Sequence, residues 1–129
     1  MKIKTLIVVL VTIVLSACSP KITTNLTNKQ PALRAEEKIA LLDVHHNLPE
    51  GTTKIGDLRF QDSGFSTDCS FNSLMNRARI QARENGANIV KVVEKKAPDL
   101  LSSCYRLKIE LYKYDGDVSR IPQYQLTLD

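Results

Sequence analysis

The spacing of apolar residues along the chain predicts one helix set among several strands. From Phe71 to about Asn85, apolar residues recur at helical spacing, which places them on one face of a helix. Ser70 stands where a residue caps the first turn, and Gly86 stands where a left-handed residue ends the last one. The apolar stripe comprises Phe71, Leu74, Met75, Ala78 and Ala82.

Four other segments have the composition or the alternation of strands. They are Lys38 to His46, Lys54 to Gln61, Asn88 to Glu94 and Tyr105 to Leu111. The last alternates most clearly, because its apolar residues face one way while Arg106, Lys108 and Glu110 face the other. The order β-β-α-β-β predicts a small two-layer α+β domain, with one helix packed on a mixed sheet. A right-handed crossover through the helix makes the second and third of these strands parallel.

The first residues have the pattern of a secretion signal. Lys2 and Lys4 precede an apolar run from Thr5 to Leu15, which is shorter than the roughly 20 residues of a membrane-spanning helix. The run closes with Leu15-Ser16-Ala17-Cys18, which resembles the lipobox of bacterial lipoproteins. This resemblance implies that residues 1–17 are removed and that Cys18 carries acyl chains. Ordinary secretion, with Cys18 left as a thiol, is the alternative.

The pattern divides the chain into three parts. Residues 1–17 form the signal peptide, residues 18–38 the lipidated cysteine and a flexible, mostly polar tether, and residues 39–129 a single domain. The apolar positions of residues 118–129 are compatible with a tail or with one more edge strand. Ser19 stands where enteric lipoproteins retained in the inner membrane carry aspartate, and residues 19–22 contain no acid. We therefore expect an outer-membrane protein that faces the periplasm and is held by its lipid.

Composition excludes several classes of partner. Residues 1–17 contain two of the 18 basic residues and none of the 14 acidic ones, so the mature part has a formal charge of only +2. This charge is too small to favour nucleic acid or an acidic polymer. The chain has no tryptophan and few aromatic residues, which argues against a stacking platform for sugars or bases.

Two cysteines remain once Cys18 is committed to lipid. Cys69 and Cys104 form an even pair in an oxidising compartment, and no Cys-x-x-Cys spacing indicates a redox motif. The predicted topology brings both to the same end of the sheet, where the separation of about 4.4–6.8 Å that a disulfide requires between α-carbons can be met. We predict a Cys69–Cys104 disulfide that stabilises a domain with a modest core.

A short motif after the predicted helix resembles known envelope domains. Gly86-Ala87-Asn88, followed by a valine-rich strand, is similar to a Gly-Ala-Asn signature of small α+β domains. One such family is the outer-membrane sensor lipoprotein of the Rcs phosphorelay, and another is named for heavy-metal binding. The resemblance spans about residues 53–112 and implies the fold and an envelope location. The Rcs sensor domain has two disulfides, whereas this domain can form one.

Few side chains indicate chemistry. His45 and His46, with Asp43 nearby, are weak metal candidates, because neighbouring residues of a strand point to opposite faces and a third ligand is needed. The chain has no Gly-x-Ser-x-Gly motif and no phosphate loop, so we expect no enzymatic activity. A basic helix face is a candidate for partner docking or simply a solvated surface. Its residues are Arg77, Arg79 and Arg83.

These observations predict a non-enzymatic interaction module. We expect a tethered lipoprotein that contacts another envelope protein in sensing or assembly, with no cofactor beyond the lipid on Cys18. A periplasmic lipoprotein that binds a small ligand or a metal is the alternative.

Overall fold

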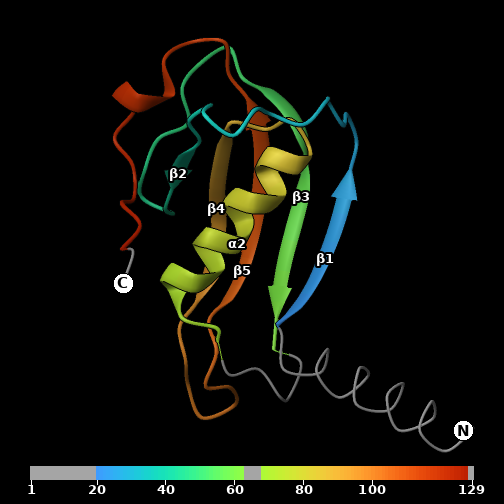
Figure 1. The fold of residues 1–129 in the computed structure, drawn as a ribbon. Helices are drawn as coiled ribbons and strands as arrows, with labels where there is room; N and C mark the ends of the chain where they lie inside the picture. The colour runs from blue at the N-terminus through green and yellow to red at the C-terminus, as the bar shows by residue number, and fades with distance from the viewer. Residues whose placement is uncertain (1–19, 63–67, 128–129) are drawn as a thin grey trace, which may run out of the picture.

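One helix packs against one face of a five-stranded mixed sheet in the computed structural model of the chain, which describes residues 20–62 and 68–127 (Figure 1). The predicted α+β class is confirmed. In chain order the elements are β1 (Lys21–Leu26), β2 (Ala40–Leu42), β3 (Thr53–Gln61), α2 (Phe71–Glu84), β4 (Ile89–Lys96), β5 (Arg106–Lys113) and the 3-10 helix η2 (Val118–Arg120).

Strand β5 is the centre of the sheet, whose order is β1-β3-β5-β4-β2. It is antiparallel to β3 on one side and to β4 on the other. The strands before and after α2 therefore run parallel, as predicted, with β5 between them. Edge strand β1 is antiparallel to β3, and edge strand β2 is parallel to β4.

The helix begins and ends at the predicted residues. The Ser73 backbone N–H donates to Ser70 Oγ at 3.2 Å, which satisfies one of the amides that the first turn leaves unpaired. Gly86 has a φ of 77°, a conformation that glycine adopts at low cost. A Cβ there would also lie 2.5 Å from Gln30 Cβ, because the β1–β2 connection passes close to this helix end.

The predicted tether of residues 18–38 is wrong for most of its length. All six residues of β1 pair with β3, and the Leu33 N–H donates to the Arg83 carbonyl oxygen at 2.9 Å. An edge strand with one solvated face needs few apolar residues, and Ile22 packing against the core is enough to give β1 a buried side. Because Lys21–Leu26 is largely polar, its sequence pattern did not predict a strand.

Two other predicted boundaries also change. The first predicted strand, Lys38 to His46, is reduced to Ala40–Leu42, because Asp43 begins a turn closed by the His46 N–H donating to the Asp43 carbonyl oxygen at 3.1 Å. Within the described part of the tail, residues 118–127, no strand forms. The 3-10 helix η2 is followed by an extended segment that runs back to the start of α2, where the Thr127 N–H donates to Asn72 Oδ1 at 2.9 Å.

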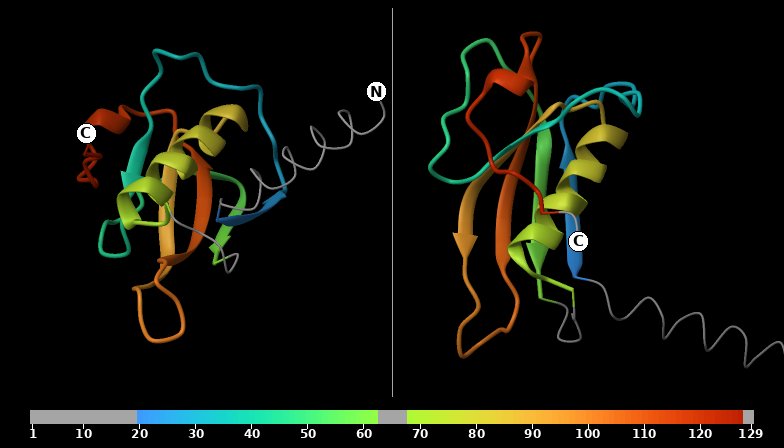
Figure 2. Two further views of the ribbon diagram at one scale, coloured as in Figure 1. Left: turned by 60° about the horizontal axis from the view of Figure 1, so that its bottom comes forward. Right: turned by 60° about the vertical axis from the view of Figure 1, so that its left-hand side comes forward.

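The buried residues form one main core and one small cluster on opposite faces of the sheet. The main core lies between α2 and the sheet and includes Leu74, Met75 and Ile109. The small cluster lies beside β2 on the other face and consists of Ala40, Leu42, Ile89 and Val118. Figure 2 shows that no helix or strand of the described residues covers the rest of that second face.

We predict that Gly56→Ala destabilises the domain by about 2 kcal/mol through overpacking and releases β1 from the sheet. The added Cβ would lie 2.5 Å from the Asn25 carbonyl oxygen and 2.9 Å from Leu26 Cα, both backbone atoms of β1. Denaturant unfolding measures the loss, and hydrogen exchange should show faster exchange of the β1 amides.

The matched control is Gly51→Ala. Gly51 has a φ of 79° and no atom within 4 Å of an added Cβ, so this variant should lose only about 1 kcal/mol through local backbone strain. Unchanged exchange of β1 in Gly56→Ala would contradict the close approach of the two strands.

Candidate functional site

The uncovered side of the sheet is the candidate site, and we call it the open face. It consists of outward side chains of β1, β3, β4 and β5. They are Thr23, Asn25, Asp57, Arg59, Val93, Glu94, Lys108 and Glu110. A hollow of about 360 Å³ lies at its centre. Val93 lines this hollow with 42% of its surface exposed, beside a β-bulge between Val92 and Glu94.

Charges of both signs are paired across the open face. Lys108 Nζ lies 3.1 Å from Glu94 Oε2, and Lys54 Nζ lies 3.0 Å from Asp57 Oδ1 and 3.2 Å from Glu110 Oε2. The hydrogen bond from Lys108 lowers the pKa of Glu94. Exposed pairs such as these add little stability. They place side chains of opposite charge next to one another on the open face.

A second hollow, of about 460 Å³, extends the open face toward the end of the sheet where β3 and β4 finish. Arg59, Lys96 and Arg106 line it together with Asp62 and Glu94, so its wall is mixed in charge with a basic excess. Its volume lies within the range of about 300–1,000 Å³ that is typical of small-molecule sites.

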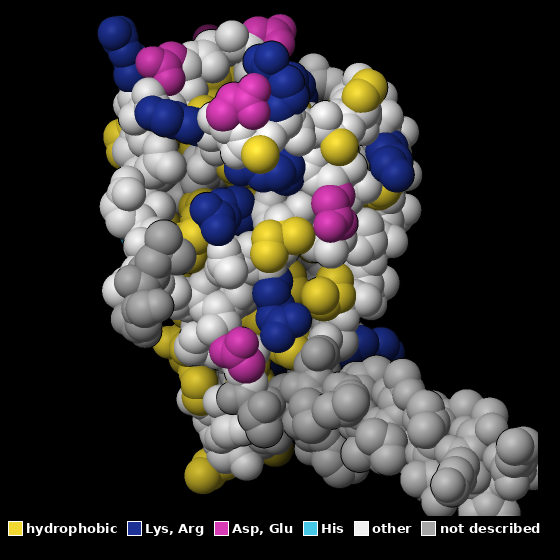
Figure 3. Space-filling view, in the orientation of Figure 1, with side chains coloured by type: hydrophobic (Ala, Val, Ile, Leu, Met, Phe, Trp, Pro, Cys, Tyr) yellow, Lys and Arg dark blue, Asp and Glu magenta, His cyan; other side chains and the backbone are white. Residues whose placement is uncertain are grey.

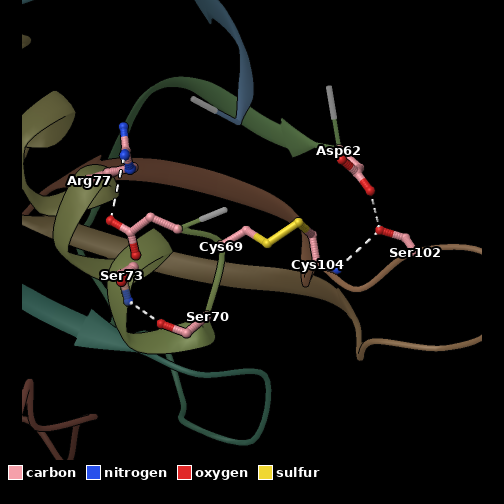
Figure 4. Close-up of a disulfide and its surroundings, with 8 residues drawn as sticks. Asp62, Cys69, Ser70, Ser73, Arg77, Ser102 and Cys104 are labelled. Atoms are coloured by element: carbon pink, nitrogen blue, oxygen red, sulfur yellow. Dashed lines mark hydrogen bonds and ion pairs between the residues drawn. A yellow bond between two sulfur atoms is a disulfide. The ribbon is translucent and has the colours of Figure 1, made fainter. Parts of the chain in front are cut away.

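The predicted disulfide closes this end of the domain and is confirmed (Figure 4). Cys69, just before α2, is bonded to Cys104, just before β5, with 5.1 Å between the α-carbons. The Cys104 N–H donates to Ser102 Oγ at 3.1 Å, and this hydroxyl donates to Asp62 Oδ2 at 2.6 Å. The disulfide and these bonds connect the end of β3, the start of α2 and the loop before β5.

Asp43 and His46 bind the protein itself rather than presenting a metal site. The Asp43 backbone N–H donates to His46 Nδ1 at 2.9 Å, and Lys95 Nζ donates to the Asp43 carboxylate at 2.9 Å. Burial lowers the pKa of His46. The His45 ring lies against the His46 ring, with centroids 4.1 Å apart. Among residues 20–62 and 68–127, no group of three or more His, Cys, Asp or Glu side chains could hold a metal ion.

The three predicted surface arginines do not form one free basic patch. Arg83 Nη1 donates to the Glu37 carbonyl oxygen at 2.9 Å and so fastens the β1–β2 connection to α2. Arg79 donates to Asn76 Oδ1 at 2.7 Å, and Arg77 lies 3.7 Å from Asp68. Figure 3 shows basic, acidic and apolar side chains interspersed over the helix side of the molecule.

Sequence reasoning missed the centre of the open face. Lys108 and Glu110 were placed correctly on the polar side of their strand, but Thr23 and Asn25 were assigned to the tether. The alternation of Ile22 with polar neighbours was the available signal for β1. No local signal marks the bulge that leaves Val93 exposed, since Val92 and Val93 read as one buried run.

Comparison with known proteins gave no family for the chain. No protein-family model, no curated protein and no solved structure matches it. The resemblance to the Rcs sensor lipoprotein and to the family named for heavy-metal binding therefore stays a prediction. Cys18 lies outside the described residues, so its acylation also stays a prediction. Of the helices in the described part of the chain, none is long and apolar enough to cross a membrane.

We predict that replacing both Cys69 and Cys104 with alanine lowers the free energy of unfolding by about 4 kcal/mol, because the sequence separation of 35 residues sets the entropy of the closed loop. Denaturant unfolding measures the loss. Reductant should shift the unfolding midpoint of the wild type to that of the double variant and leave the double variant unchanged. A wild type insensitive to reductant would contradict a stabilising disulfide.

We predict that Tyr112 makes stability fall between pH 10 and pH 12. Burial, followed by the hydrogen bond that its hydroxyl donates to Glu110, raises its pKa from 10.0 to about 12. The folded state therefore favours the neutral phenol, and this contribution is present below pH 10 and lost as the pH rises toward 12. Relative to Tyr112→Phe, which cannot ionise, the wild type should lose stability across this window. Parallel pH profiles of the two proteins would refute the shift.

Proposed function

We propose that this protein is a non-enzymatic envelope lipoprotein that is held on the outer membrane by lipid on Cys18 and binds another envelope protein through the open face. The uncovered sheet face carries the proposal. The two-layer domain leaves the β1, β3, β5 and β4 part of one sheet face uncovered, with an apolar side chain, Val93, in a hollow among paired charges. Such an arrangement has the mixed polarity that is usual for non-obligate interfaces.

The lipobox-like residues and the disulfide support the compartment. Leu15-Ser16-Ala17-Cys18 indicates export and lipidation, and a disulfide in a domain this small is typical of proteins outside the cytoplasm. The paired charges support the partner class. The pairs Lys108–Glu94 and Lys54–Glu110 each present both signs within a few ångströms, which suits a complementary protein surface better than a uniformly charged polymer.

Binding of a small anionic ligand is the second candidate function. The hollow of about 460 Å³ beside the disulfide favours it, since Arg59, Lys96 and Arg106 line that hollow. A ligand there would shift the unfolding midpoint of the oxidised protein, whereas a protein partner would be captured by crosslinking.

The experiment places a photo-crosslinking amino acid at Val93 in the full chain within intact cell envelopes. We expect one specific crosslinked protein, because position 93 lies in the central hollow of the open face. The matched position is Ile80, which is exposed to a similar extent (46% against 42%) but lies on α2 among the arginines. Crosslinks from position 80 alone would move the interface to the helix surface.

Cys18→Ser tests the anchor in the same preparation. This variant should leave the membrane fraction and lose most of the crosslinked product, because the released domain is no longer concentrated on the membrane that carries its partner. Unchanged membrane fractionation of Cys18→Ser would refute lipid anchoring.

A further inference from the structure

The loop between β4 and β5, residues 97–105, presents two leucines to solvent. Leu100 is 106% exposed and Leu101 is 89% exposed, whereas Val44, the next most exposed large apolar residue of the described segments, is 47% exposed. Hydrophobic side chains protrude at the bottom of Figure 3, the end at which this loop lies in Figure 1. Full exposure of two adjacent leucines is costly in water, so a function for them is expected.

Hydrogen bonds within the loop order the backbone that carries these leucines, and Leu101 lies at the rim of the hollow of about 460 Å³. The Leu101 and Ser102 N–H groups donate to Asp99 Oδ1 at 2.8 and 3.0 Å, and the Asp99 N–H donates to the Ser102 carbonyl oxygen at 2.8 Å. The Cys69–Cys104 disulfide fixes the end of the loop. Ordering the leucines beforehand lowers the entropy cost of placing them in a binding partner.

The leucine loop lies at the end of the sheet where the chain enters from Cys18. The strand register pairs Lys21 with Gln61, Phe60 with Leu107, and Arg106 with Lys96. The start of β1 and both ends of the loop therefore lie at the same end of the sheet. Figures 1 and 2 show the same arrangement. Only Ser19 and Pro20 separate Cys18 from Lys21, and the three residue steps between them span about 10 Å when fully extended.

We propose that Leu100 and Leu101 insert into the surface of the bilayer to which Cys18 is anchored, and so fix the orientation of the domain on the membrane. This inference rests on the proposed function, because the acyl chains bring this end of the sheet to the lipid. The anchor and the loop then form two contacts at one end. The open face stands beside them and stays accessible to a partner.

Lipid fits this loop better than a protein partner does. A tip of two leucines is far smaller than the roughly 800 Å² that each partner of a stable protein complex buries. It does match the shallow apolar insertion, about 5–10 Å deep, of peripheral membrane proteins. Asp99 is the only acid in residues 97–105 and lies 2.8 Å from Arg106, so its charge is paired. Lys96 flanks the loop with its side chain 63% exposed and suits anionic head groups.

The test uses fluorescence, since the chain contains no tryptophan. Leu101→Trp is prepared as the full, processed chain, and mass spectrometry establishes whether Cys18 is acylated. The protein is then reconstituted into vesicles of phosphatidylethanolamine and phosphatidylglycerol with brominated acyl chains. We expect a blue shift and strong quenching of the indole emission, and we expect Leu100→Ser in the same chain to reduce the quenching.

The matched control is Ile80→Trp, which replaces an exposed aliphatic residue about 13 Å along α2 from its first residue and should show neither effect. Acylated Leu101→Trp without quenching would overturn the insertion and leave the anchor intact, as would a crosslink from position 101 to an envelope protein instead of quenching. Equal quenching of Leu101→Trp and Ile80→Trp would also overturn the insertion of the leucine loop. An unmodified Cys18 would overturn the anchor and this inference together.

Discussion

The Cys69–Cys104 disulfide is the constraint on which one end of the sheet depends, the end for which we propose membrane contact. It joins a residue two positions before α2, the only long helix of the described residues, to a residue two positions before the central strand β5. Through Ser102 the same linkage reaches Asp62 at the end of β3. The end of β3 and the start of α2 are therefore held beside the start of β5, which is distant in sequence, at one end of the sheet. The hollow beside β4 and the ordered leucine loop both lie on this framework.

The second determinant is the two-layer architecture. A single helix with the buried stripe Leu74, Met75, Ala78 and Ala82 can cover only one face of a five-stranded sheet. The other face is apolar only next to β2, where the small cluster around Leu42 covers it. Elsewhere the strands alternate, and their outward residues pair across the sheet as Lys108 does with Glu94. Incomplete coverage thus provides a surface that is both ordered and accessible.

Adding β1 to the sheet changes how the domain would lie on the membrane in the lipoprotein that we propose. With a flexible tether of residues 18–38, the domain would move freely and no part of it would face the lipid. With β1 starting at Lys21, one end of the sheet stays close to Cys18. The polar segment that follows is also held, since Arg83 binds the backbone at Glu37. The residues that were predicted to form a linker are therefore bonded to the C-terminal end of α2.

The sequence by itself determined the α+β class, the helix with its cap and its terminating glycine, the alternation of β5 and the disulfide pair. These features depend on local spacing, on capping chemistry and on the number of cysteines, all of which can be read along the chain. Tertiary structure alone decided that the polar segment Lys21–Leu26 forms an edge strand, that Val93 stays exposed at a bulge, and that Arg83 and Asp43 bind the protein's own backbone and side chains. Edge pairing, bulges and long-range polar contacts depend on which segment lies alongside, and a single sequence does not encode that neighbour locally.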